Sequence, residues 1–218
     1  MNDSDLELAQ LLCTRLCHDL AGPIGAVAAG VELIGGDPSA ADAETLSLIG
    51  DSSAAATLKL KFVRAALGSA GGALDMEALL AGYLGATTGG AGAPKVSWPQ
   101  AAAFERFAAA AGPSWRQAIL NLCLAVLEMQ PGCKELAISA DGASVRIEAK
   151  GQSTRTTARR DELEAALTGA AAQKDLTAKT IQAFLAGRMI LAGGGAVTVA
   201  SPDGPGGSTV AVVARFGP

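Results

Sequence analysis

Apolar and polar positions in the first third of the chain recur with a helical period. On a helical wheel turned by about 100° per residue, most large apolar residues between positions 6 and 34 fall within one arc. An acidic residue or a serine at positions 3–5 caps this segment, and the glycine- and proline-containing stretch 35–39 ends it. The pattern predicts a helix over about Leu6 to Ile34 with a core-facing apolar arc of Leu12, Leu16, Leu20, Val27, Val31 and Ile34, extended on one side by Cys13 and Ile24.

A second helical pattern runs from about Asp42 to Leu67. Its apolar or small positions recur in steps of three and four, which is typical of a heptad seam; they are Leu46, Ile49, Ser53, Ala56, Leu60, Val63 and Leu67. Two long helices alone bury too little surface to be stable, because each needs neighbours on more than one side. We therefore expect a homodimer in which two helical hairpins form a four-helix bundle. The glycine-rich stretch 68–72 predicts a flexible linker.

Beyond this linker the pattern changes to mixed helices and strands. Residues 85–94 are glycine-rich and predict a loop, and Asp141-Gly142 predicts the turn of a hairpin. The expected helices are Leu74 to Leu84, Ser114 to Met129, Arg160 to Leu167 and Thr177 to Leu191, and the expected strands are Lys95 to Trp98, Glu135 to Ser139, Ser144 to Ala149, Gly195 to Ala200 and Thr209 to Phe216. The predicted fold class is α + α/β, with a helical-hairpin domain at 1–70 and an α/β domain at 73–218.

Composition narrows the class of protein. The chain has 218 residues, of which 50% are hydrophobic, enough for one or two domains with a real core. A net charge of −4 gives no basic bias toward nucleic acid. We find no unbroken run of about 18 apolar residues, so we expect no membrane span. The four cysteines form no CxxC motif, which favours a reduced, cytoplasmic protein.

The segment LLCTRLCHDLAGPIGAV holds the single histidine of the chain, His18. Cys13, Cys17 and His18 resemble the start of a metal site, but structural zinc usually has four ligands and no fourth is in sight. On the wheel His18 lies opposite the apolar arc, and its neighbours are mostly small or polar, which leaves room for another protein. The neighbours on this face are Leu11, Thr14, Arg15, Gly22, Gly25 and Ala29.

His18, Asp19 and Pro23 form a combination with a chemical interpretation. A neutral imidazole is a nucleophile near pH 7, and Asp19 can orient the ring or hold its proton. Pro23 has no N–H to donate to the carbonyl of Asp19, so it loosens the helix beside the histidine. Taken singly, each residue has an ordinary alternative: a surface histidine, a solvated charge and a helix kink. The three together on an exposed face are much less frequent by chance, which favours a functional histidine.

The sequence His18-Asp19-Leu20-Ala21-Gly22-Pro23 resembles the H-box of sensor histidine kinases, H-[ED]-x-x-x-P. The longer stretch from Arg15 to Ala26, followed by Gly30-Val31-Glu32-Leu33, resembles the ChpT-type histidine phosphotransferases. The resemblance implies that His18 takes a phosphoryl group from a receiver-domain aspartate of a hybrid histidine kinase and passes it to response regulators. It also implies that the receiver supplies the Mg²⁺ ion, so this chain needs no cofactor or metal of its own.

The α/β domain resembles a histidine-kinase ATPase domain that has lost its nucleotide site. The stretch Gly193 to Val210 is similar to the last hairpin of those ATPases, and Asn121-Leu122-Cys123-Leu124-Ala125 is similar to their N-box. The second asparagine of that box, which helps to hold magnesium in kinases, is Ala125 here. No aspartate stands in Glu148-Ala149-Lys150-Gly151-Gln152, where the adenine-binding box is expected. We interpret Gly193-Gly194-Gly195 as a turn, Asn121 as a remnant or a helix-surface polar group, and the domain as one that binds protein.

Basic residues of the second helix, Lys59, Lys61 and Arg64, lie largely off its seam. They are expected to steer the acidic active site of a receiver, with a merely solvated face as the alternative. Thr14 and Arg15 are expected to contact phosphoryl oxygens or the receiver. The favoured function is a phosphorelay histidine phosphotransferase without ATP-dependent kinase activity. Its rivals are an ATP-dependent histidine kinase and a non-catalytic dimeric scaffold.

Overall fold

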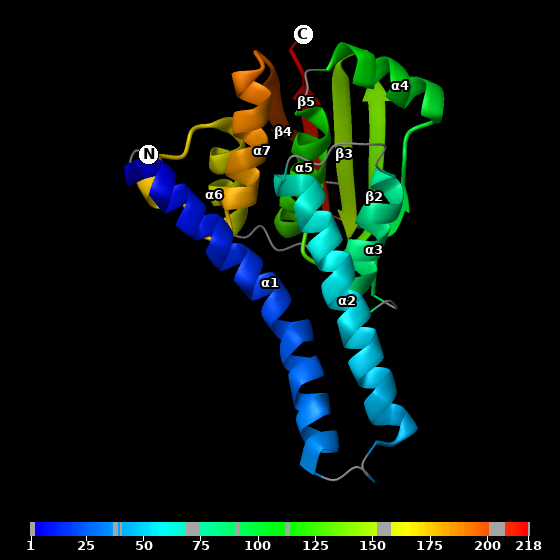
Figure 1. Cartoon of the computed structure of the whole chain (residues 1–218). Coiled ribbons are helices and arrows are strands. Elements are labelled where there is room, and N and C mark those ends of the chain that lie inside the picture. The colour runs from blue at the N-terminus through cyan, green and yellow to red at the C-terminus, as the bar shows by residue number, and fades with distance from the viewer. Residues whose placement is uncertain are drawn as a thin grey trace. The chain divides into compact units, whose positions relative to one another are not determined.

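The computed structural model describes residues 3–36, 39, 41–68, 75–89, 92–111, 114–151, 158–200 and 208–217 (Figure 1). Its contacts divide the chain into two compact units. Residues 13–93 form one, here called the hairpin unit, and residues 1–12 with 94–218 form the other, here called the sheet unit. The predicted domain boundary near residue 71 stays a prediction, since it falls within residues 69–74, outside the described residues.

Three helices make up the hairpin unit: α1 (Asp3–Gly36, from residue 13 onward), α2 (Ala43–Leu67) and α3 (Met76–Thr88). The carboxylate of Asp42 caps α2 by accepting from the Thr45 amide at 2.7 Å, and this hydrogen bond lowers the pKa of Asp42. Asp75 caps α3 in the same way, at 2.9 Å from the Ala78 amide. The helices predicted over 6–34 and 42–67 are confirmed, and the third continues to Thr88 into the segment predicted as a loop.

Small residues bring α1 and α2 together. Gly30 is buried against Ile49, and a Cβ at Gly30 would lie 2.5 Å from Cγ1 of Ile49. Such close approach is possible because glycine has no side chain, as is usual where helix backbones come near each other. The larger apolar contacts of the unit lie between α2 and α3, where Phe62, Leu80 and Tyr83 are buried.

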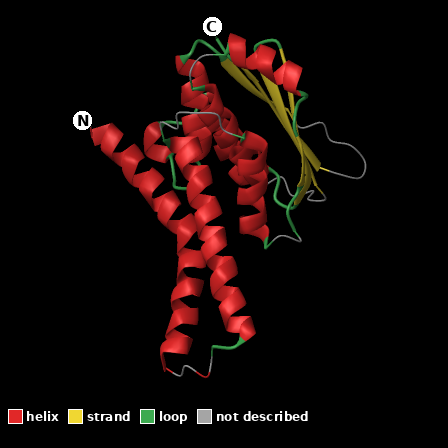
Figure 2. Ribbon diagram, turned by 45° about the vertical axis from the view of Figure 1, so that its right-hand side comes forward, coloured by secondary structure: helices red, strands yellow, loops and turns green. Residues whose placement is uncertain are grey.

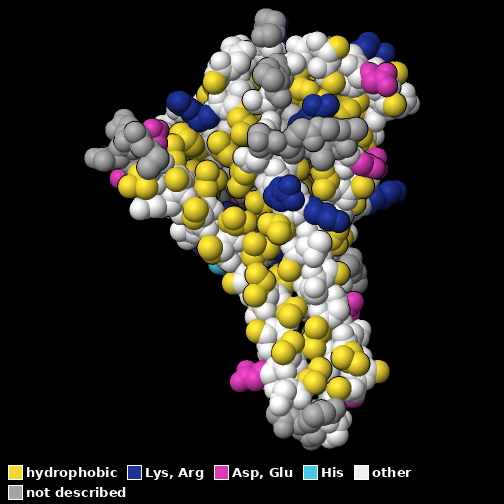
Figure 3. Space-filling model, in the orientation of Figure 1, with side chains coloured by type: hydrophobic (Ala, Val, Ile, Leu, Met, Phe, Trp, Pro, Cys, Tyr) yellow, Lys and Arg dark blue, Asp and Glu magenta, His cyan; other side chains and the backbone are white. Residues whose placement is uncertain are grey.

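The apolar arc predicted to face the core is not buried within the described chain. Val31 is 55% exposed and Ile24 is 54% exposed, while the rest of the arc is at best half-buried. On α2 the predicted seam positions Leu46 and Leu60 are also exposed. The reason is angular: Gly30, which meets α2, lies at one edge of the arc, at the same wheel angle as Leu12, while Val31 and Ile24 lie toward the other edge and stay exposed. Figure 3 shows hydrophobic side chains gathered along both helices of the hairpin.

The sheet unit is a five-stranded sheet in the order β1-β2-β3-β5-β4. β1 runs parallel to β2, and the other neighbouring pairs are antiparallel. Figure 2 shows helices against one face of the sheet. The strands are β1 (Lys95–Ser97), β2 (Cys133–Asp141), β3 (Ser144–Gly151), β4 (Ala196–Ala200) and β5 (Ser208–Arg215), and the helices are α4 (Ala101–Ala110), α5 (Trp115–Met129), α6 (Ala158–Thr168), α7 (Ile181–Ala192) and the short 3₁₀ helix η2 (Gln173–Asp175).

Side chains alternate across the sheet as the sequence pattern predicted. Val145, Ile147 and Ala149 of β3 are buried, whereas Arg146 and Lys150 point to the other face and pair with Glu148. The hairpin predicted at 141–142 is confirmed, with Gly142 at a φ of 54°. Helix α4 was not predicted, although its sequence AAAFERFAAA places Phe104 and Phe107 three residues apart, as one face of a helix requires. Phe104 and Phe107 anchor it in an aromatic cluster with Trp98, Trp115 and Phe216.

Candidate functional site

His18 projects from the middle of α1 with 85% of its side chain exposed. Its Nδ1 lies 3.5 Å from Oδ1 of Asp19, which is the outer limit of a hydrogen bond. A carboxylate beside Nδ1 favours the tautomer that carries its proton there. In that tautomer Nε2 holds the lone pair and faces away from Asp19. The exposed position predicted for His18 is confirmed.

Asp19 is held by Arg15, one helical turn earlier. Nε of Arg15 donates to Oδ2 of Asp19 at 3.0 Å, and the two side chains are only 17% and 13% exposed. The two carboxylate oxygens of Asp19 thus face different partners, Arg15 and His18. Arg15 was predicted to contact a partner or phosphoryl oxygens; in the structure one of its donors orients Asp19. The predicted contact to a partner stays a prediction.

Tyr83 of α3 is buried next to Arg15 and Asp19. Its ring lies 4.4 Å from that of Phe62 between centroids, and its hydroxyl interacts with Arg15. Burial raises the pKa of Tyr83 to about 12, and the negative charge of Asp19 acts in the same direction, while Arg15 partly opposes both. Sequence analysis did not single out Tyr83; its only signal there is that it is the single tyrosine of the chain.

Because the chain has one tyrosine, an absorbance titration at the phenolate wavelength reports Tyr83 alone. We expect a midpoint near pH 12 in the folded protein and near pH 10 in denaturant. The stability that Tyr83 contributes is complete below pH 10 and is lost as the pH rises toward 12, since only the unfolded chain releases the proton in that window. Asp19→Asn should lower the folded midpoint and Arg15→Met should raise it. A folded midpoint near pH 10 would contradict the buried hydroxyl.

Lys59 of α2 contacts the backbone of α1 beside the histidine. Its Nζ donates to the carbonyl oxygen of Asp19 at 3.1 Å, and the side chain is half-buried. Lys59 was predicted to steer a receiver together with Lys61 and Arg64. The latter two are exposed, as a steering role requires, while the ammonium of Lys59 is engaged within the hairpin.

A groove lies beside Pro23, with a cavity volume of about 610 Å³. It is lined by small and apolar residues of all three helices, with Asp51 as its one ionisable group among the described residues. The lining residues are Gly22, Pro23 and Ala26 of α1, Asp51, Ser52, Ala54, Ala55 and Leu58 of α2, and Gly85 and Ala86 of α3 with its C-cap Gly89. Of the other predicted contact residues, Leu11 is half-buried, Thr14 and Gly25 are exposed, and none of the three lines this groove.

The N-box-like segment of α5 is buried in the sheet unit. Asn121 donates from Nδ2 to the carbonyl of Gln117 at 2.8 Å, and Ala125 is 2% exposed. Asn121 is therefore not the helix-surface group allowed for in the sequence analysis, since its own helix backbone and the core surround it. Gly194 has a φ of 74° and turns the chain from α7 into β4, so the interpretation of Gly193–Gly195 as a turn is confirmed.

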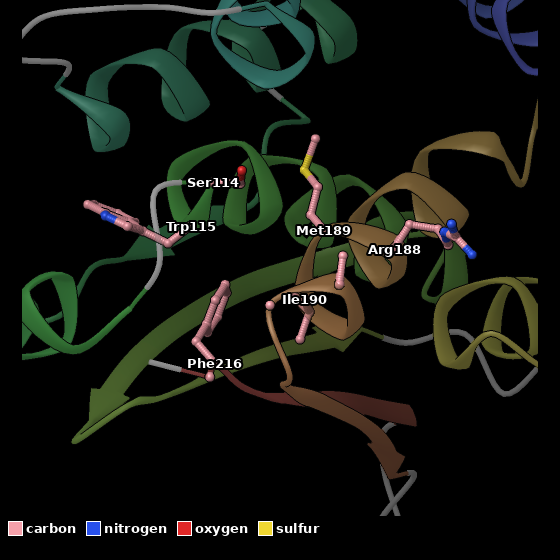
Figure 4. A pocket seen from close by; sticks show the side chains of 9 residues that line it. Ser114, Trp115, Arg188, Met189, Ile190 and Phe216 are labelled. Carbon is pink, nitrogen blue, oxygen red and sulfur yellow. The ribbon is translucent and has the colours of Figure 1, made fainter. Parts of the chain in front are cut away.

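A half-open cavity of about 560 Å³ lies at the ends of α5 and α7 (Figure 4). Trp115, Met189, Ile190 and Phe216 give it a largely apolar lining, and Arg188 is the one charged residue among the described residues around it. Ser114 and Arg188 are the polar side chains of the described lining, which holds no carboxylate.

Helix α1 is long and apolar enough to cross a membrane, with a mean hydropathy of 1.2 in the best window of Ser4–Gly35. The sequence analysis expected no such span. Arg15, His18 and Asp19 stand at the middle of this helix, where ionisable groups are costly in a bilayer. An apolar helix that packs on other helices passes the same test, so this property is weak evidence of a membrane segment. Among the described residues, no group of three or more side chains could hold a metal ion.

Comparison with known proteins identifies the class. The model of the histidine phosphotransferase C-terminal domain matches residues 75–205, more than half of the chain. The chain therefore belongs to the histidine phosphotransferase family. The resemblance to ChpT-type proteins is also confirmed: the chain is 43% identical over 70 residues to the protein phosphotransferase ChpT of Brucella abortus (strain 2308). That alignment spans 32% of this chain and 32% of the relative.

Solved structures support the fold. A bacterial phosphotransferase matches with a TM-score of 0.70 at 23% identity, covering 95% of this chain and 96% of that one. The helical N-terminus followed by a mixed α/β domain is thereby confirmed as the fold. A histidine kinase from Burkholderia phymatum STM815 covers 99% of this chain and 95% of its own, but its TM-score of 0.38 is too low to carry an argument. The dimeric bundle and the likeness to an ATPase domain stay predictions.

Proposed function

We propose that this protein is a phosphorelay histidine phosphotransferase. It shuttles a phosphoryl group between receiver-domain aspartates of a hybrid histidine kinase and of response regulators through phosphorylated His18. The observation that carries the proposal is the pairing of a solvent-exposed imidazole with an oriented carboxylate at Nδ1. Membership of the histidine phosphotransferase family supports it.

In the transfer step, the lone pair of Nε2 attacks the phosphorus of a receiver aspartyl phosphate. A P–N bond forms while the P–O bond to the aspartate breaks, and the carboxylate leaves with the bonding electrons. Nδ1 keeps its proton throughout, and the charge of Asp19 stabilises the positive charge that develops on the ring. The reverse reaction on a second receiver regenerates neutral His18. The Mg²⁺ ion belongs to the receiver, so the chain supplies a positioned nucleophile and no cofactor.

The receiver docks against the His18 face of α1. Gly22, Gly25 and the groove beside Pro23 leave space for a helix of the partner, since a Cβ at either glycine would meet nothing within 4 Å. The exposed cations Lys61 and Arg64 attract the acidic active site of a receiver. Leu11, Thr14 and Arg15 complete the contact along α1.

We also propose a homodimer in the cytoplasm, formed through the apolar arc of α1 and the seam of α2. Ile24, Val31, Leu46 and Leu60 are 46–55% exposed in the single chain, and covering apolar side chains of this kind with a partner is favourable. Pairing two copies about a two-fold axis would cover these side chains on both. His18 lies opposite this arc on the wheel, so it stays accessible in the dimer.

The proposal is tested by supplying the purified protein with a receiver that carries ³²P on its aspartate. We expect label to move to this chain as an acid-labile, alkali-stable phosphoamidate, and then to move to a second, unphosphorylated receiver. Incubation with Mg-ATP alone should give no label and no heat of binding, which separates a phosphotransferase from a kinase. A chain that takes label only from ATP, or takes none from any receiver, would refute the proposal.

A further inference from the structure

Pro23 removes one backbone hydrogen bond from α1. In an α-helix the carbonyl of residue 19 accepts from the amide N–H of residue 23, and proline has none. The carbonyl of Asp19 is therefore left without its helical donor one turn from the phosphoacceptor. A carbonyl in this position needs another donor or water, because an unsatisfied backbone group is costly when it is shielded from solvent.

Lys59 supplies that donor from the other helix. Its Nζ lies 3.1 Å from the carbonyl oxygen of Asp19, across 40 residues of sequence. Lys61, two residues further along α2, is exposed, so proximity to the phosphoacceptor is not a general property of lysines on this helix. The half-buried side chain of Lys59 directs its ammonium at the one carbonyl that Pro23 leaves without a helical donor.

We propose that Lys59 is a positioning residue for phosphoryl transfer, which completes the turn opened by Pro23 and thereby fixes Asp19 beside His18. Asp19 is then held at both ends: its carboxylate by Arg15, over the buried Tyr83, and its backbone by Lys59. Pro23 still loosens helix α1, but Asp19, which orients the imidazole, is held at its backbone carbonyl by Lys59 of α2. The role of Lys59 in transfer rests on the proposed function, whereas its contact with Asp19 is independent of that function.

The two possible roles of Lys59 predict different kinetics. If Lys59 positions Asp19, Lys59→Met lowers the maximal rate of transfer from a phosphorylated receiver about tenfold and leaves the KM for that receiver unchanged. If Lys59 instead docks the receiver, the same variant raises KM and leaves the rate constant unchanged. Lys61→Met is the matched control, and as an exposed docking residue it should change KM alone. Lys59→Arg keeps a cationic donor and should recover most of the rate.

Pro23 provides the decisive cross-check. In Pro23→Ala the amide N–H of residue 23 is restored and can donate to the carbonyl of Asp19. The hydrogen bond from Lys59 to that carbonyl is then no longer needed. We expect Lys59→Met to change the transfer rate less than twofold in the Pro23→Ala background, against about tenfold in the native background. Equal effects in the two backgrounds would overturn the proposal, because independent residues act additively.

A measurement without any receiver separates this inference from the proposed function. Hydrogen exchange of the backbone amides at 20–22 and 24–26 should accelerate about tenfold in Lys59→Met and return to the Pro23→Ala value in the double variant. Unchanged exchange in Lys59→Met would overturn the link between Lys59 and the turn, whatever the transfer assay gives. If exchange responds as expected but the wild type takes no label from any receiver, the proposed function fails, and the role of Lys59 in transfer fails with it.

Discussion

His18→Ala is expected to abolish labelling by a phosphorylated receiver. The chain has one histidine, and no other exposed imidazole can form the P–N bond. The substitution should leave stability nearly unchanged, because 85% of the side chain is exposed and its hydrogen bond to Asp19 is long. Thermal unfolding and circular dichroism check the fold, and acid-labile ³²P checks the reaction. The loss should therefore be chemical rather than structural.

His18→Gln is the matched control for shape and polarity. Its amide can still donate to Asp19, but it has no nucleophilic lone pair on nitrogen, so it should be as inactive as alanine. Both variants should still bind the receiver with wild-type affinity, since docking uses the surrounding face of α1. Labelling of His18→Ala at the wild-type level would place the phosphoryl group on another residue. If the variants fully support signalling in cells, the non-catalytic scaffold is the better account.

Val31→Asp is expected to convert the protein from dimer to monomer. Val31 is 55% exposed in the single chain and lies in the apolar arc that we assign to the dimer contact. Losing the burial of valine and placing a carboxylate in an apolar contact costs about 2 kcal/mol at least. The two-fold axis places the substitution in the interface twice. The free energy of dimerisation therefore weakens by about 4 kcal/mol, and Kd rises roughly 1,000-fold. Analytical ultracentrifugation across a concentration series measures this directly.

Leu33→Asp is the matched control for the dimer. Leu33 is 62% exposed on the same helix, but it lies about 200° around the wheel from Val31 and thus outside the arc. This variant should keep the wild-type dissociation constant. Dissociation caused by Leu33→Asp but not by Val31→Asp would move the interface to the other side of α1, toward His18. A wild type that sediments as a monomer at every concentration would refute the dimer itself.

The local chemistry of the site could be predicted because it depends on residues close in sequence. His18, Asp19 and Pro23 lie within two turns of one helix, so adjacency in sequence puts the carboxylate near the imidazole, and helical geometry leaves one carbonyl without its donor. The hairpin of the sheet unit could also be predicted from sequence, since alternation over residues 144–149 and the Asp141-Gly142 turn are local signals. Helix α4 was missed because its apolar signal rests on only two large residues, Phe104 and Phe107, in a short run of alanines, and aromatic packing from distant segments holds it.

The sequence by itself therefore determined the family and most of the helices and strands, and it led to the proposal of His18 as the phosphoacceptor. Only the tertiary structure decided which residues hold that acceptor in place. Lys59 and Tyr83 reach Asp19 and Arg15 from other helices, and no local period encodes such contacts. It also decided which side of α1 meets α2: Gly30, at one edge of the apolar arc, packs closely on Ile49, while Val31 and Ile24, toward the other edge, are exposed. The physical reason is the same in both cases, because a helix repeats its own geometry from sequence alone, whereas its neighbours depend on how the whole chain closes on itself.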